Sequence, residues 1–457
     1  MKHSQHSKVP GLLLVCLLSC GFATAQAPQY VPFSLAQPVL QAYQNSLPAA
    51  LKPPTAAAWD KWVRTQDQQI RTRLERGEED TLTNLLRLGV TYTKEERISY
   101  SLLERFGHDS YVNSLADKRA TDLIRAMNAP NASEGMVEMR TFLVKQGYNL
   151  RTPQGQKRVK DYMLANLARM RDEVLKAEKE IYNKQGANFS QQFKDRGIST
   201  DSNLYPDYMI ELHLRHLMQQ GMLKAGSIRR VAIVGPGLDF VNKNAGSDFY
   251  PPQTTQPFAV IDTLSRLHLA DPATVEVETF DISSRVNKHL ARARAEAAAG
   301  KPYTIQLLSD PSDQWTKDYA AGFLEFWQKL GDQIGKQTTR IPVPDAAAGI
   351  WNRAVSVRPA VVERVSPVDM NVVFQTLALP ADKQFDLVIG TNIFVYYGSL
   401  EQALARTNLA TMIRPGGFLI TNEALAGNAP GLTDSLQTKV EVTANDTEHM
   451  YTYARQK

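Results

Sequence analysis

The 457-residue chain has few cysteines, no long apolar run and no cluster of basic residues. Its two cysteines, Cys16 and Cys20, both lie near the start, so the rest of the chain has no thiol for a disulfide or for catalysis. No segment reaches the roughly 18 consecutive apolar residues expected of a transmembrane helix. The net charge is +5, without a run of Lys or Arg, which argues against nucleic acid as a partner.

The first 25 residues have the three parts of a secretory signal peptide. Lys2 and Lys8 supply the basic part, residues 11–22 are apolar, and Ala-Thr-Ala at 23–25 is a small-residue cleavage site. We therefore expect cleavage after Ala25 and a secreted or periplasmic mature chain without a transmembrane segment. The "LLSC" stretch at 17–20 also resembles a lipoprotein box, so lipidation of Cys20 is a minor alternative.

Residues 26–195 are expected to form an all-α N-terminal domain with a proline-rich, extended lead-in up to about residue 55. Apolar side chains recur at three- and four-residue steps, most clearly in 158–184, where Lys and Glu fill the other face. We find no candidate catalytic or ligand-binding residues in this part of the chain.

From about residue 206, short apolar strands alternate with amphipathic helices. This alternation predicts an α/β domain over residues 196–457, with a doubly wound and mostly parallel sheet. The last two strands, 435–444 and 448–456, have no helix between them and are expected to pair as an antiparallel hairpin at the sheet edge. Residues 302–350 interrupt the alternation and are interpreted as an insertion, with capping of the site as its suggested role.

Several polar and glycine residues fall at the ends of the predicted strands, where parallel sheets bind ligands. The turn at 235–237 contains two glycines, which leave room for a ligand next to the backbone. Asp281 ends the second strand, where a carboxylate can accept both ribose hydroxyls. Asp369 and Met370 follow the third strand, where they could meet the edge and face of an adenine. Asn392 ends the fourth strand at the mouth of the pocket.

A nicotinamide dinucleotide site fits this pattern poorly. Phe240 occupies the third glycine position of the G-x-G-x-x-G fingerprint. Asp281 also lies farther along the chain than the usual ~20 residues.

Five stretches of the sequence, in order, resemble the class I S-adenosylmethionine-dependent methyltransferases over about residues 206–457. They are "VAIVGPGLDF", "VETFDIS", "VDMN", "FDLVIGTNIFVYY" and "MIRPGGFLITNE". The most specific part is 385–420, where an Asp-led strand and a helix precede Arg-Pro-Gly-Gly and another strand. "TNIFVYY" is similar, more weakly, to the chemotaxis-receptor carboxylate methyltransferases. The resemblance implies a seven-stranded sheet with a reversed last strand, and S-adenosyl-L-methionine as cofactor.

The resemblance also implies which residues contact the cofactor. Carried over, these are Gly235, Pro236, Gly237, Asp239, Asp281, Ile282, Asp369, Met370 and Asn392. Asp239 departs from the family, which usually has a small residue at that position. The following loop is long, and its Asp248 and Tyr250 either line the pocket or lie in a surface loop.

Methyl transfer is an in-line displacement in which the protein mainly positions the reactants. A base is needed only when the acceptor must lose a proton. No His or Cys follows a predicted strand, so Asn392, Tyr396 and Tyr397 are the candidate catalytic residues. His213 and His216 are interpreted as the polar face of a helix rather than as metal ligands, because no third ligand is evident.

Two functional hypotheses remain open. The first is an exported or envelope-associated methyltransferase with an unknown acceptor. The second is a methyltransferase-derived binding or structural protein of the envelope that has lost catalysis. Export favours the second, because we know of no supply of the cofactor outside the cytoplasm, whereas the intact strand-end acids favour the first.

Overall fold

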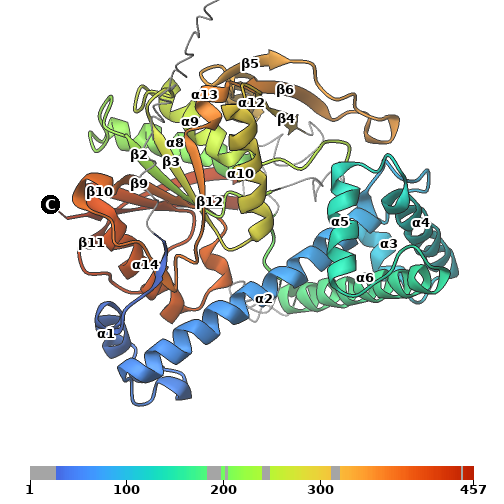
Figure 1. Ribbon diagram of the computed structural model, residues 1–457, viewed down its shortest axis with the longest axis horizontal. Coiled ribbons are helices and arrows are strands. Elements are labelled where there is room, and N and C mark those ends of the chain that lie inside the picture. The colour runs from blue at the N-terminus through green and yellow to red at the C-terminus, as the bar shows by residue number, and fades with distance from the viewer. Residues whose placement is uncertain are drawn as a thin grey trace, which may run out of the picture.

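The computed structural model describes residues 27–182, 197–200, 204–238, 248–309, 320–443 and 446–456. The expected signal peptide with both cysteines, and Asp239, lie outside these residues. The described residues form a helical bundle and a larger body around a central sheet, which one long helix joins (Figure 1).

The central sheet has seven strands in the order β11-β12-β10-β9-β2-β3-β7. Their bounds are β2 (Arg230–Val234), β3 (Glu276–Asp281), β7 (Val365–Asp369), β9 (Phe385–Gly390), β10 (Ile413–Thr421), β11 (Leu432–Thr443) and β12 (Asp446–Arg455). The strands from β10 to β7 pair in parallel, whereas β12 runs antiparallel to both of its neighbours. The predicted edge hairpin is therefore present, with β12 inserted between β10 and β11.

Both faces of this sheet are buried, because successive side chains of a strand point to opposite faces. On β2, Val231 and Ile233 contact one hydrophobic core, while Ala232 and Val234 contact another. The first core includes residues of α8 (Tyr205–Gln219), α9 (Gln256–Arg266) and α10 (Ser284–Ala298). The second includes residues of α14 (Ser399–Met412). This double covering explains why the central strands are almost continuously apolar.

The N-terminal lead-in is not extended as expected. β1 (Gln29–Tyr30) pairs with β8 (Gln375–Thr376), and α1 (Phe33–Ala42) packs against α14. Pro38 lies inside α1, where Val39 and Leu40 are buried in the second core. Burial of this apolar face thus outweighs the proline-rich composition. A short 3₁₀ turn, η1 (Ala49–Leu51), follows.

The joining helix, α2 (Ala56–Leu88), spans about 50 Å at 1.5 Å per residue. Its first half contributes Trp59 and Ile70 to the core of the sheet, and its second half contributes Leu82 and Leu86 to the core of the bundle. The bundle is completed by α3 (Tyr100–Arg105), α4 (Ser110–Asn128), α5 (Glu134–Lys145) and α6 (Pro153–Tyr182). Among the described helices, none is both long and apolar enough to cross a bilayer.

The segment expected to be an insertion, 302–350, belongs to a second, three-stranded antiparallel sheet that extends seven residues beyond it. The segment contains β4 (Tyr303–Ser309), α12 (Ala320–Lys329), β5 (Gly335–Thr338) and η2 (Asp345–Ala347). It is followed by β6 (Trp351–Val357), and the strand order is β4-β6-β5. Phe323 and Phe326 of α12 belong to the core that includes α8. The chain then returns to the central sheet through α13 (Pro359–Val362) and β7. The insertion thus packs beside the main sheet without interrupting its parallel pairing.

Candidate functional site

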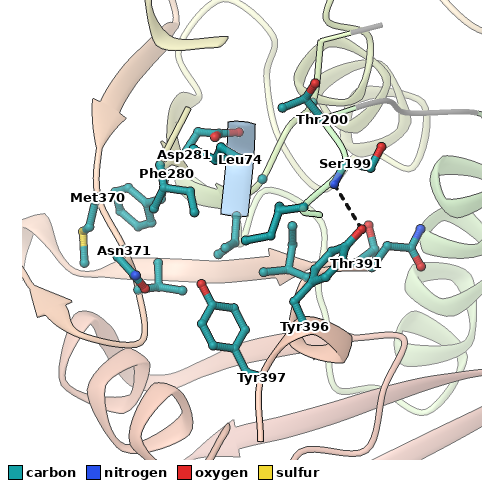
Figure 2. A pocket seen from close by; sticks show the side chains of 18 of the residues that line it. Leu74, Ser199, Thr200, Phe280, Asp281, Met370, Asn371, Thr391, Tyr396 and Tyr397 are labelled. Atoms are coloured by element: carbon teal, nitrogen blue, oxygen red, sulfur yellow. Dashed lines mark hydrogen bonds between the residues drawn. The ribbon is translucent and has the colours of Figure 1, made fainter. Parts of the chain in front are cut away.

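A pocket lies at the carboxyl ends of β2, β3, β7 and β9, where the strand order reverses direction (Figure 2). This is the position at which open parallel sheets bind ligands. Its lining comes from the strand ends and the residues after them, from α2, from the segment 198–200, and from the first turns of α8 and α9: Leu74, Ile198, Ser199, Thr200, Pro206, Val234, Gly235, Gly237, Gln256, Phe280, Asp281, Ile282, Met370, Asn371, Val372, Thr391, Asn392, Ile393, Tyr396 and Tyr397.

The glycine turn after β2 forms part of the pocket floor. Gly235 and Gly237 have φ angles of 65° and 75°, a region that only glycine adopts without strain. A Cβ at Gly235 would lie 2.1 Å from Cδ1 of Ile393. Gly235 also donates its N–H to the carbonyl of Phe280, which joins the turn to the end of β3. Pro236 does not line the pocket.

Asp281 ends β3 with its side chain at the pocket wall and only 8% exposed. Its Oδ1 accepts the N–H of Ser283 at 2.7 Å. The following helix, α10, is capped by Ser283 rather than by Asp281. The pKa of Asp281 is raised to about 7, mainly by burial and in smaller part by the Asp369 carboxylate, while the Ser283 N–H and the charges of Arg285 and Arg71 oppose the shift. The pocket therefore contains a carboxyl group that titrates near neutral pH.

The residues after β7 divide between the pocket and its surroundings. Met370 lines the pocket with the apolar Ile282. Asp369 does not line it: its side chain is 52% exposed and forms an ion pair with Arg71 of α2 at 2.7 Å. It borders a second hollow, which shares Leu74 and Ile282 with the first. Asp369 thus lies at the junction of the two hollows rather than inside the main pocket.

The three candidate catalytic residues all line the pocket. Asn392 has a φ of 59°, and its N–H donates to Oδ1 of Asn422 at 2.8 Å. The Tyr396 hydroxyl accepts the N–H of Ser199 at 3.4 Å, the bond drawn in Figure 2. Tyr397 is buried, and burial raises its pKa, so its hydroxyl remains protonated at neutral pH. Tyr397 is therefore not poised to remove a proton.

Part of the lining comes from residues that the sequence did not single out. Leu74 of α2 and residues 198–200 all line the pocket. Ile198 donates its N–H to the carbonyl of Arg73 at 3.2 Å, and Leu238 donates to that of Thr200 at 2.7 Å. No described residue of the insertion lines the pocket. In the described residues, the covering role suggested for the insertion therefore falls to α2 and residues 198–200.

The long loop before α9 contributes to folding rather than to this pocket. Asp248 accepts hydrogen bonds from the N–H of Val90 at 2.9 Å and from the N–H and hydroxyl of Thr91 at 3.2 and 2.8 Å. Asp248 and Tyr250 are both buried, and neither lines the pocket. The two alternatives raised by the sequence, a pocket wall or a surface loop, are both incorrect for these residues.

The two histidines of α8 form hydrogen bonds to side chains of the central sheet. His213 and His216 each contact the Thr438 hydroxyl, at 2.7 and 2.8 Å. Burial lowers the pKa of His213 to about 4, so it is neutral. Across the described part of the chain, no group of three or more His, Cys, Asp or Glu side chains could hold a metal ion.

Glu423 is another ionisable residue that the sequence did not single out. It lies two residues beyond β10, and its carboxylate accepts hydrogen bonds from the N–H groups of Phe394 and Val395. Burial raises its pKa to about 8. Glu423 does not line the pocket, but it holds η4 (Phe394–Tyr396), which does.

The fold and the pocket position correspond to the class I methyltransferase resemblance: seven strands, a reversed β12 and a pocket at the reversal of strand order. No protein-family model matches the chain, and no curated protein matches it.

Solved structures similar to this chain are S-adenosylmethionine-dependent methyltransferases with different substrates. The N-methyltransferase NodS from Bradyrhizobium japonicum WM9, in complex with S-adenosyl-L-homocysteine, has 11% identity and a TM-score of 0.27, covering 59% of this chain and 100% of that one. The glycopeptide N-methyltransferase MtfA has 12% identity and a TM-score of 0.27, covering 56% and 93%. Magnesium protoporphyrin IX methyltransferase from Synechocystis PCC 6803, with bound S-adenosylmethionine, has 12% identity and a TM-score of 0.25, covering 62% and 97%. With scores this low, any functional inference depends on the strand order and pocket of this chain itself.

Proposed function

We propose that the pocket binds S-adenosyl-L-methionine and that the protein is a methyltransferase of unknown acceptor. The observation that carries the proposal is Asp281, a buried carboxyl group at the end of β3 and beside the glycine turn. A carboxylate at this position can accept hydrogen bonds from two ribose hydroxyls. Oδ1 already accepts the Ser283 N–H, which orients the carboxyl group. A carboxylate has acceptor capacity beyond that single bond.

The remaining lining fits the other parts of the cofactor. The turn at Gly235 and Gly237 lets the backbone approach its amino-acid end, and Ile282 and Met370 offer apolar surfaces for its base. When bound, the cofactor supplies an activated methyl group. The protein would position the acceptor in line with that group, with Asn392 at the mouth of the pocket as a hydrogen-bonding group.

The pocket lining limits the kind of acceptor. Among the described lining residues there is no His, Lys or Glu, and Tyr397 stays protonated. Asp281 is committed to the ribose in this proposal. Acceptors that need no protein base at the moment of transfer are therefore favoured.

Calorimetry with S-adenosylhomocysteine, S-adenosylmethionine and NAD tests the proposal. We expect the first two to bind and NAD not to bind. Asp281→Ala should weaken binding of S-adenosylhomocysteine at least about tenfold, because a charge-assisted hydrogen bond contributes roughly 1.5–3 kcal/mol.

Ser283→Ala is the matched control. It removes the cap of α10 and should cost about 0.5–2 kcal/mol of stability while leaving the affinity nearly unchanged. Equal affinities of wild type and Asp281→Ala would contradict the cofactor role of Asp281.

A binding or structural protein without catalysis is the second candidate. The described lining residues include no His, Lys or Glu, which favours this candidate, as does the export that we propose from the N-terminal sequence. Binding of S-adenosylmethionine without methyl transfer to any component of the envelope fraction would support this candidate over the enzyme.

A further inference from the structure

Helix α2 reaches the end of the pocket where the base of the cofactor would lie. Leu74 on α2 and Ile282 after β3 line both the main pocket and the adjoining hollow that Asp369 borders. The two side chains offer apolar contacts for the faces of a purine, and Asp369 offers a carboxylate for its edge. The N-terminal half of the chain therefore contributes directly to this end of the site.

Arg71, one turn before Leu74, connects α2 to the ends of two strands. Its Nη1 donates to Asp369 Oδ1 at 2.7 Å and to the carbonyl of Ile282 at 3.3 Å, and its Nη2 donates to Gln375 Oε1 at 3.3 Å. The planar guanidinium presents its donors in a fixed geometry, so several simultaneous bonds define where Asp369 lies relative to Ile282.

The Arg71 guanidinium also contacts the carboxylate of Asp67, a buried residue with 3% exposure. Arg71 Nε donates to Asp67 at 3.3 Å. Asp67 also accepts the Tyr30 hydroxyl at 3.0 Å and the Asn371 side-chain amide at 2.9 Å. A chain of polar contacts thus runs from β1 through α2 to the residues after β7.

The resemblance implies that Asp369 meets the edge of the cofactor's adenine, and we propose that Arg71 is the positioning residue that holds Asp369 so that Oδ2 can accept the 6-amino group. The inference rests on the proposed function. The bond to Arg71 uses Oδ1, and a carboxylate can accept a further donor on its second oxygen. A carboxylate accepts from an amino group but repels a carbonyl oxygen, so this arrangement selects adenine over a 6-oxo purine.

The test compares S-adenosylhomocysteine with its 6-oxo analogue, the inosine derivative, by calorimetry. Wild type should prefer the adenine form by about tenfold or more, because the 6-oxo form removes the donor and places a carbonyl oxygen against Oδ2 of the carboxylate. In Arg71→Gln the preference should fall to about threefold or less, because Asp369 loses the group that holds it. In Asp369→Asn the preference should also disappear, since an amide can donate to the 6-oxo group.

Lys61→Gln, at an exposed lysine of the same helix, is the matched control and should behave as wild type. A preference that is unchanged in Arg71→Gln would overturn the inference even if that variant melts at a lower temperature, because a purely structural role weakens both ligands equally. Wild type that binds both ligands equally would overturn base recognition but leave the proposed cofactor site intact. Failure of wild type to bind either ligand would reject the proposed function itself.

Discussion

At the scale of single residues, Asp281 links the pocket to pH. Burial raises its pKa to about 7 in the free protein, whereas donors from a ribose would stabilise the ionised form and lower it. Binding should therefore release a proton below pH 7, and the affinity for S-adenosylhomocysteine should rise with pH until about 7 and then level off. In the free protein, the raised pKa means that the free energy of unfolding falls as pH rises from about 4 to 7.

Calorimetry at pH 6 in two buffers with different ionisation enthalpies measures the released proton directly. Asp281→Asn, which cannot ionise, should show neither proton release nor the rise in affinity. The same pH dependence in the variant and in wild type would assign it to another group.

Gly235 permits a second test at the residue scale. Gly235→Ala requires an alanine at a φ of 65° and a Cβ 2.1 Å from Cδ1 of Ile393, which lines the pocket. The left-handed backbone alone costs roughly 1–2 kcal/mol, and displacement of Ile393 should also weaken S-adenosylhomocysteine binding. Chemical denaturation and calorimetry would measure the two effects.

Gly221→Ala is the control that separates the loss of stability from the loss of ligand affinity. Gly221 has a φ of 69°, but an added Cβ there would meet no atom within 4 Å. It should lose similar stability without losing affinity. If both variants bind the ligand like wild type, the turn after β2 does not contact the cofactor.

The residues at the strand ends were predictable because parallel strands place their carboxyl ends on one edge of a sheet. Gly235, Asp281, Met370 and Asn392 all line the pocket for this reason. The position of Asp369 was not predictable, because its partner, Arg71, is 298 residues away in the sequence. Local patterns cannot reveal which distant helix will bind a strand-end side chain.

At the scale of elements, the loop containing Asp248 fastens the sheet body to the bundle. Its carboxylate accepts three hydrogen bonds from Val90 and Thr91, just after α2. Asp248→Ala removes the buried carboxylate that accepts all three bonds and should destabilise the protein by about 1–3 kcal/mol. Thr91→Val, which removes only the hydroxyl, should cost about 1 kcal/mol.

Differential scanning calorimetry would compare the melting temperatures of these two variants with that of wild type. Their affinity for S-adenosylhomocysteine should stay unchanged at temperatures where they remain folded, since Asp248 does not line the pocket. A loss of affinity in Asp248→Ala with an unchanged melting temperature would instead place this loop in the site.

Helical periodicity predicted helices in the N-terminal part but not how α2 is shared between two cores. The half that includes Trp59 packs with the sheet, and the half that includes Leu86 packs with the bundle. Similarly, the prolines of the lead-in suggested an extended chain, yet α1 forms because it can bury Val39 and Leu40 against the sheet body. Burial against distant parts of the chain determines both the packing of α2 and the formation of α1, and a local sequence pattern does not reveal it.

At the scale of the whole molecule, the proposed export would place the protein outside the cytoplasm, where we know of no supply of S-adenosylmethionine. Residues 1–25 have the composition of a signal peptide, and β1 (Gln29–Tyr30) lies after them in the chain. Cleavage after Ala25 would leave β1 and the Tyr30–Asp67 hydrogen bond intact. The mature chain can therefore keep the polar contacts that lead from Tyr30 to Arg71.

Mass spectrometry of the protein from its native host tests this. We expect a mature chain that begins at Gln26 and, because Cys16 and Cys20 are removed, does not react with thiol reagents. A lipid attached to Cys20 would indicate the lipoprotein alternative, in which the chain is tethered to a membrane. An intact Met1 would contradict export and place the protein with the cytoplasmic pool of S-adenosylmethionine. That outcome would remove the main objection to catalysis and favour the enzyme over the binding protein.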